Sequence, residues 1–119
     1  MIRALFVCSQ NRLRSPTAED IFARWQGVES ASAGTDSQAD VPLDGEAIEW
    51  ADVIFAMEKA HRARITRRFA RHVNGKRIVV LDIPDDYAFM DPALVALLEK
   101  KVTPHLIRMG ARPPQPETP

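Results

Sequence analysis

The feature that most constrains this chain is a junction near its N-terminus, where an apolar segment, a short polar loop and an amphipathic segment follow one another. Residues 2–7 form a largely apolar run typical of a buried parallel strand. Residues 16–26 then place apolar side chains at helical spacing, with Pro16 where the first turn of a helix tolerates proline. A strand, a short loop and a helix in this order aim loop amides and the positive end of the helix dipole at one point. The sequence therefore predicts an anion-binding cradle at residues 8–14.

The loop carries a chemically specific set of side chains. Its cysteine, Cys8, is the only one in the chain, Arg14 follows after five residues, and Ser15 comes next. A thiol reacts as its thiolate, and a helix N-terminus together with a guanidinium lowers the pKa of a nearby thiol. The planar fork of an arginine can hold two oxygens of a phosphoryl group. We therefore expect Cys8 to be a nucleophile, Arg14 to bind a phosphoryl group and the Ser15 hydroxyl to donate to the sulfur.

An alternative reading is that Cys8 is a small buried hydrophobe at the end of a strand, as free cysteines usually are. The next four residues are Ser-Gln-Asn-Arg, which are unsuited to a core. Asn11 also tolerates the left-handed backbone that a tight cradle turn requires. The loop therefore favours a functional site.

This stretch resembles the signature of the low molecular weight protein tyrosine phosphatases, a Cys-x5-Arg-Ser-Pro loop at the end of the first strand. The matching residues are Cys8, Asn11, Arg14, Ser15, Pro16, Ala18 and Glu19. The resemblance covers about residues 2–109 and includes Ser-Ala-Gly-Thr at 32–35 and Met57-Glu58 after an apolar strand. It implies a hydrolase with a cysteinyl-phosphate intermediate. Its phosphate-binding and supporting loop residues would be Ser9, Gln10, Asn11, Arg12, Leu13 and Ser15.

The rest of the chain alternates between segments typical of strands and of helices. We predict strands at 2–7, 28–33, 52–57 and 77–81, and helices at 16–26, 42–50, 59–72 and 92–109, the last kinked or broken at Pro104. This alternation predicts a three-layer α/β fold with an open parallel sheet in the order 2-1-3-4, which is flavodoxin-like and phosphotyrosine phosphatase I-like. We expect one domain over residues 1–110 and a Pro-rich disordered tail over 111–119.

The carboxyl ends of the strands predict where a second catalytic group lies. The loops at 8–14, 34–35, 58–59 and 82–87 meet at that edge of the sheet. The resembled family carries its general acid in an Asp-Pro-Tyr segment after the fourth strand, which implies Asp85 as the acid and Tyr87 at the pocket rim. Asp86 stands where the family has proline and is the alternative acid, whereas Asp91 is better explained as a helix cap.

Four departures from the family concern the substrate more than the chemistry. Leu13 stands where a second cysteine is usual, so an oxidised Cys8 has no internal partner for a disulfide. Arg12 occupies a position that is commonly apolar; it either favours substrates with additional negative charge or points into solvent. Gln10 replaces a small residue, and the segment between 35 and 52 lacks the aromatic residue that walls the phosphotyrosine slot. Phosphotyrosine protein or a small phosphomonoester is the expected substrate.

Composition limits the remaining classes of function. Sixteen basic and sixteen acidic residues balance, so bulk charge gives no argument for nucleic acid or membrane as a partner. One cysteine excludes an intrachain disulfide and a cysteine-based zinc site, and we expect neither a metal nor a cofactor. The absence of a recognisable signal peptide or spanning segment predicts a cytoplasmic protein. The basic segment 59–72 is expected to be a solvated face with His61 at the surface, although His61 could line the pocket.

The sequence thus predicts a metal-independent, cysteine-dependent phosphatase of the protein tyrosine phosphatase type. A non-catalytic phosphate- or phosphopeptide-binding module of the same fold is the alternative from another class. Arsenate reduction and sulfur transfer on the same loop are less favoured. The thioredoxin-coupled form of arsenate reduction needs further cysteines, and sulfur transfer needs no acid. Nothing in the sequence specifies an oligomeric state.

Overall fold

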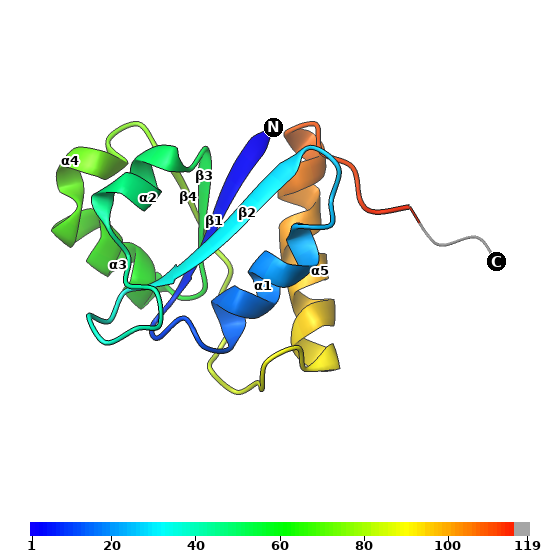
Figure 1. Ribbon diagram of the computed structural model, residues 1–119, viewed down its shortest axis with the longest axis horizontal. Helices are drawn as coiled ribbons and strands as arrows, with labels where there is room; N and C mark the ends of the chain where they lie inside the picture. The colour runs from blue at the N-terminus through cyan, green and yellow to red at the C-terminus, as the bar shows by residue number, and fades with distance from the viewer. Residues whose placement is uncertain (116–119) are drawn as a thin grey trace.

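The computed structural model describes residues 1–115 and is built on one sheet of four parallel strands in the order β2-β1-β3-β4. The strands are β1 (Ile2–Cys8), β2 (Val28–Gly34), β3 (Val53–Ala56) and β4 (Arg77–Val80). The helices are α1 (Arg14–Phe22), α2 (Gly45–Trp50), α3 (Lys59–Arg68), α4 (Ala70–Val73) and α5 (Pro92–Arg108). The predicted parallel α/β sheet and its strand order are confirmed (Figure 1). No helix within residues 1–115 is long and apolar enough to cross a membrane.

Two cores lie on opposite faces of the sheet, because successive side chains of a strand point in opposite directions. Phe6 of β1 stacks on Phe22 of α1 in the larger core. Its neighbour Leu5 lies in the smaller core with Ile48 of α2 and Ile65 of α3. The helix α5 adds four fully buried residues to the larger core, namely Leu94, Leu98, Val102 and Leu106. Helices α1 and α5 therefore cover one face, and α2, α3 and α4 the other (Figure 1).

The first helix begins two residues earlier and ends four residues earlier than predicted. Its early start places Arg14 in the first turn, directly after the loop. It ends at Phe22 because the chain then turns back to the sheet: Gln26 pairs with Arg112, and Gly27 has φ 84. Gly27 lies in this turn, four residues after the C-cap Ala23, and glycine adopts its left-handed conformation without strain.

The second helix, in contrast to the first, starts later than predicted. The Asp44 carboxylate accepts a hydrogen bond from the Ala47 amide at 2.8 Å, so α2 begins at Gly45. Pro42, predicted near the start of this helix, instead forms a parallel bridge with Gly34. Pro42 therefore lies beside the end of β2 rather than in a helix.

Two further helix predictions are wrong in detail. The predicted helix 59–72 is interrupted at Phe69, where φ is −123° and ψ is 36°, and continues as α4. At this break the ring of Phe69 packs on the smaller core. Of the kink or break predicted at Pro104, the break is absent, since α5 continues through this residue with a buried face on both sides. Asp91 is confirmed as the cap of α5, because its carboxylate accepts from the Ala93 amide at 2.9 Å.

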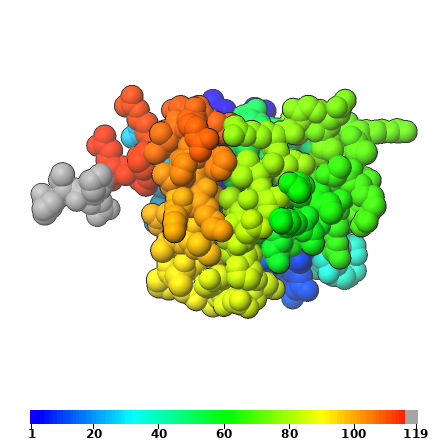
Figure 2. All heavy atoms as spheres, turned by 180° about the vertical axis from the view of Figure 1, so that it is seen from behind, coloured from blue at the N-terminus to red at the C-terminus, as the bar shows by residue number. Residues whose placement is uncertain are grey.

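The chain packs against the core beyond the predicted domain end at residue 110. Ala111 is buried, and the backbones of Arg112 and Gln26 exchange hydrogen bonds of 2.9 and 3.1 Å. Figure 2 shows α5 in orange beside the yellow segment that leads into it. Residues 116–119 of the predicted tail lie outside the described residues.

Candidate active site

The loop between β1 and α1 turns around the sulfur of Cys8. The backbone N–H of Asn11 donates to Sγ at 3.3 Å, and Asn11 has the expected left-handed backbone, with φ 56. The segment after β2 holds the outer side of the loop through three backbone hydrogen bonds. They run from the amides of Thr35, Asp36 and Asp40 to the carbonyls of Cys8, Ser9 and Gln10, at 2.9, 2.9 and 3.1 Å. The end of β2 therefore sets the curvature of the loop.

Gly34 permits this close approach of β2 to the loop. A Cβ atom at this position would lie 2.5 Å from the carbonyl oxygen of Ser9 and 2.5 Å from the Cβ of Ala39. Such distances are far inside van der Waals contact, so no larger residue fits without moving the loop. The glycine is required here by space rather than by its backbone angles.

A chain of polar side chains orients the hydroxyl next to the sulfur. The Asn11 amide nitrogen can only donate, and it donates to Ser15 Oγ and to Ser32 Oγ, both at 2.9 Å. Ser32 Oγ in turn donates to a carboxylate oxygen of Glu19. Since Ser15 Oγ accepts from Asn11, its own proton is free for Cys8 Sγ, 2.9 Å away. The structure thus places the Ser15 hydroxyl within hydrogen-bond distance of the sulfur, and its donation to Cys8 stays a prediction.

Arg14 lines the same cavity as Cys8, and three groups fix the orientation of its guanidinium. The residue is only 2% exposed. Its Nη1 donates to Glu58 Oε2 at 2.6 Å and to the carbonyl of Ile83 at 2.8 Å, while Nε lies 3.7 Å from Asp85 Oδ1. Nη2 has no hydrogen-bond partner within residues 1–115. A buried cation is costly unless it is paired, so Glu58 both neutralises Arg14 and fixes the orientation of its fork.

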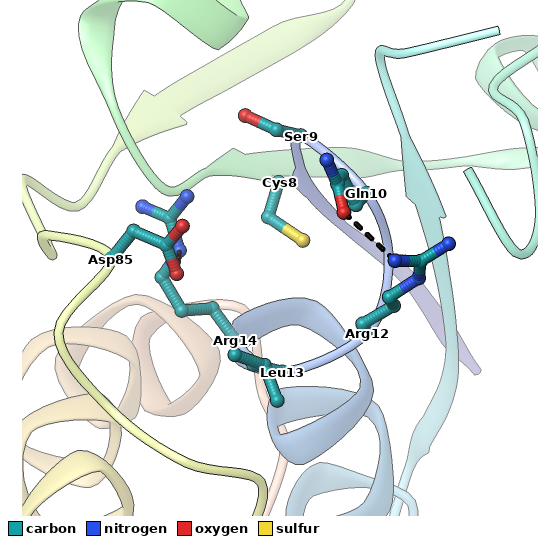
Figure 3. Close-up of a pocket in the computed structure, with 7 residues that line it drawn as sticks. All are labelled: Cys8, Ser9, Gln10, Arg12, Leu13, Arg14 and Asp85. Carbon is teal, nitrogen blue, oxygen red and sulfur yellow. Dashed lines mark hydrogen bonds and ion pairs between the residues drawn. The ribbon is translucent and has the colours of Figure 1, made fainter. Parts of the chain in front are cut away.

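The segment after β4 brings Asp85 to the same cavity. Ile83 is fully buried, and its amide donates to the Met57 carbonyl at 2.9 Å while its carbonyl accepts from Arg14. Further along, the amide of Met90 donates to Thr17 Oγ1 at 3.0 Å. Between these two anchors Asp85 lies opposite the loop (Figure 3), with its side chain 63% exposed. A carboxyl group there can exchange protons with solvent and with a bound molecule.

The two neighbours of Asp85 lie elsewhere. Asp86 is exposed and does not line the cavity. Tyr87, for which we expected a place at the pocket rim, is partly buried against the larger core and is not a lining residue. Burying an aromatic ring against a core is favourable, which gives a physical reason for this placement.

The cavity has a volume of about 470 Å³, and seven residues line it (Figure 3): Cys8, Ser9, Gln10, Arg12, Leu13, Arg14 and Asp85. Leu13 is the one side chain of the set with a purely hydrocarbon surface, and none is aromatic. Arg12 is 56% exposed at the rim, where its Nη1 donates to Gln10 Oε1 at 3.1 Å and its Nε lies 3.3 Å from Asp40 Oδ1. The mouth of the cavity is therefore polar and carries a cation.

His61 is buried, contrary to the expectation of a surface histidine. Only 2% of the residue is exposed, and Nε2 lies 2.9 Å from Ser9 Oγ. Its Nδ1 accepts from the backbone N–H of Glu58 at 3.0 Å. Burial, and next the positive charge of Arg14, lower the pKa of His61 to about 4. The ring is therefore neutral at ordinary pH.

Glu58 and His61 are the site residues that sequence reasoning missed. The loop at 58–59 was expected at this edge of the sheet, but Glu58 was given no role and His61 was considered only as an alternative pocket residue. The signal was the spacing: an acidic residue after a buried strand and a polar residue three positions later is the pattern of a helix cap. Here one side chain of that pair contacts Arg14 and the other contacts the loop.

A four-stranded parallel sheet with this order and a Cys-x5-Arg loop after its first strand is the low molecular weight protein tyrosine phosphatase fold. No protein-family model and no curated protein sequence matches the chain. Solved structures match across most of it, and the predicted resemblance is confirmed at the level of the fold.

Three of these solved structures illustrate the range of phosphatases that share the fold. The YwlE arginine phosphatase from Geobacillus stearothermophilus has a TM-score of 0.70 at 24% identity, covering 91% of this chain and 97% of that chain. The low molecular weight protein tyrosine phosphatase SP-PTP from Streptococcus pyogenes has a TM-score of 0.76 at 17% identity, covering 92% and 93%. The tyrosine phosphatase Wzb from Escherichia coli K30, in complex with phosphate, has a TM-score of 0.71 at 20% identity, covering 92% and 100%.

Proposed function

We propose that this protein is a phosphomonoesterase that acts through a cysteinyl-phosphate on Cys8. The observation that carries the proposal is one cavity lined by Cys8, Arg14 and Asp85, with Ser15 Oγ 2.9 Å from the sulfur. These groups are a nucleophile, a phosphoryl-binding fork, a proton donor and a donor to the thiolate. The fold, shared with solved phosphatases, supports the same reading.

The reaction proceeds in two displacements at phosphorus. First the Cys8 thiolate forms a bond to phosphorus, the bond to the leaving oxygen breaks, and the Asp85 carboxylic acid gives its proton to that oxygen. Then the Asp85 carboxylate takes a proton from water, the water oxygen bonds to phosphorus, and the sulfur–phosphorus bond breaks to release phosphate. Arg14 and the loop amides stabilise the negative charge on the equatorial oxygens, while Ser15 stabilises the departing thiolate.

For the substrate we propose a phosphotyrosine side chain in preference to phosphoarginine. Solved structures of this fold carry both activities in their names, tyrosine and arginine phosphatase. Arg12 at the mouth would repel the guanidinium of a phosphoarginine, whereas it would attract acidic residues beside a phosphotyrosine. Asp40 offsets part of this charge, so the preference is a difference in rate rather than an exclusion.

The first experiment is hydrolysis of para-nitrophenyl phosphate between about pH 5 and pH 7. Cys8→Ser should abolish turnover, and Asp85→Asn should lower it by about a hundredfold or more, the usual contribution of a general acid. The matched control is Asp86→Asn, one residue further along and outside the cavity, which should retain most activity. If the control is the sensitive variant, the acid is Asp86 and the assignment moves by one residue.

Two outcomes would change the proposal more deeply. Phosphate binding without any turnover by the wild type would favour the non-catalytic binding module. Equal or faster release of phosphate from a phosphoarginine peptide than from the matching phosphotyrosine peptide would contradict the substrate. In that case Arg12→Ala should be compared on both peptides, because the variant removes the charge on which the preference depends.

A further inference from the structure

The buried imidazole of His61 bridges two parts of the molecule that the proposed reaction uses. The residue lies in the first turn of α3, at the carboxyl edge of the sheet. One ring nitrogen contacts the Glu58 amide at 3.0 Å, and the other contacts Ser9 Oγ at 2.9 Å. Ser9 directly follows Cys8 and lines the cavity. The proposed chemistry leaves this buried, titratable side chain without a role.

The hydrogen-bond pattern fixes the tautomer of the ring. A backbone N–H can only donate, so Nδ1 accepts from Glu58 and carries no proton. The proton of the neutral ring is therefore on Nε2, which donates to Ser9 Oγ. The interaction is directional: His61 supplies the proton, and Ser9 keeps its own hydroxyl proton for another acceptor.

The two flanks of the loop are held in different ways. On the β2 side, backbone amides hold three successive carbonyls, and the side chains of Asn11 and Arg12 add contacts to Ser32 and Asp40. On the α3 side, the hydrogen bond from His61 to Ser9 is the side-chain contact that ties the start of the loop to the helix. The same first turn of α3 is preceded by Glu58, which holds Arg14. The N-terminal end of α3 therefore positions both the start of loop 8–14 and the guanidinium of Arg14.

We propose that His61 is a positioning residue which, as a neutral Nε2–H donor to Ser9, holds the start of loop 8–14 in its phosphate-binding conformation. The inference rests on the proposed function only in that the loop binds a phosphoryl group. His61 does not touch the phosphoryl group; it acts through Ser9. Its effect therefore falls on anion affinity and on kcat/KM together, because a displaced loop binds ground state and transition state less well.

Two conservative variants separate this role from the helix cap. Asparagine places its amide where Nδ1 lies, so His61→Asn keeps the cap acceptor but cannot reach Ser9. Glutamine places its amide near Nε2, so His61→Gln can donate to Ser9 but loses the cap. Ser9→Ala removes the acceptor and leaves the cap untouched, which keeps the test valid even if a variant at position 61 does not fold.

The measurement is the affinity for inorganic phosphate by isothermal titration calorimetry, which needs no turnover. We expect His61→Asn and Ser9→Ala each to weaken binding by about tenfold, the double variant to weaken it no further, and His61→Gln to remain within about twofold of wild type. Equal losses in the Asn and Gln variants, additive losses in the double variant, or unchanged affinity in Ser9→Ala would overturn the inference and leave the proposed function intact. Absence of phosphate binding by the wild type would overturn both.

Discussion

Acidification from about pH 7 to about pH 4.5 is expected to destabilise the folded protein through His61. An unfolded histidine takes up its proton near pH 6.5, whereas the folded state binds this proton only near pH 4. Between these two values the unfolded chain binds more protons, so the free energy of unfolding falls as the pH falls. Below about pH 4 both states are protonated and the loss is complete.

The magnitude follows from the lowered pKa. One unit of pKa corresponds to about 1.4 kcal/mol. Of the roughly 2.5 units between the unfolded pKa of 6.5 and the folded pKa of about 4, two lie above pH 4.5. A small part of the loss in stability has already occurred at pH 7. The expected contribution of His61 is therefore about 2 kcal/mol. The side chain is only 3% exposed, so solvent screening reduces this figure little. The charged groups that act on the ring are Arg14 and Arg64, which lower its pKa, and Glu58 and Asp85, which raise it.

The assay is urea unfolding at both pH values, with His61→Gln as the variant that cannot titrate. Other groups titrate in both proteins, including His105, whose pKa burial also lowers, so they largely cancel in the comparison. The wild type should lose about 2 kcal/mol more than the variant on acidification. Equal losses would refute the argument that burial keeps this ring neutral.

Three other perturbations test separate parts of the structure. Ser15→Ala removes the proposed donor to the Cys8 sulfur, so it should slow the breakdown of the cysteinyl-phosphate more than its formation. The measurement is pre-steady-state kinetics, in which the variant should show a larger burst and a lower steady-state rate. An equal effect on both phases would contradict this role. Gly34→Ala should cost about 1–3 kcal/mol and weaken phosphate binding, since its Cβ would meet the Ser9 carbonyl at 2.5 Å. The control Gly75→Ala has open space but φ +80, and should cost about 1 kcal/mol with phosphate affinity retained. Excess EDTA should leave hydrolysis of para-nitrophenyl phosphate unchanged, because each proposed step uses side chains of this chain; strong inhibition that added metal reverses would contradict the mechanism.

The sheet and the phosphate-binding loop could be predicted from the sequence because their determinants are local. The run at residues 2–7 is apolar except for Arg3, and the loop after it combines a cysteine, an arginine and a residue that tolerates left-handed backbone within a few positions. Strand order followed from the alternation of strands and helices. These arguments need no knowledge of contacts distant in sequence.

The errors in the helix predictions have a different origin, because a contact outside the helix itself takes part in each of them. The first helix ends early because Gln26 pairs with Arg112, and the predicted helix 42–50 starts late because Pro42 lies beside Gly34. The break at Phe69 accompanies packing of its ring on the core. At Pro104 the buried face of α5 outweighs the loss of one helical hydrogen bond. Tertiary packing therefore accounts for all four differences between the predicted and the observed helices.

In the candidate site, too, the sequence predicted the residues of the loop but not the side chains that position them. Cys8, Arg14 and Ser15 are neighbours in sequence, whereas Glu58 and His61 reach them from more than forty positions away. A sequence pattern marks the latter pair only as a possible helix cap, because the loop and β3 must first be placed side by side before either side chain has a partner. The same reasoning applies to substrate choice. Arg12 belongs to the loop, but its charge at the cavity mouth depends on Asp40, which the segment after β2 supplies. The proposed nucleophile and phosphoryl-binding group therefore lie in one short stretch, while the proposed acid Asp85, the positioning residues and the selectivity depend on segments that only the fold brings to it.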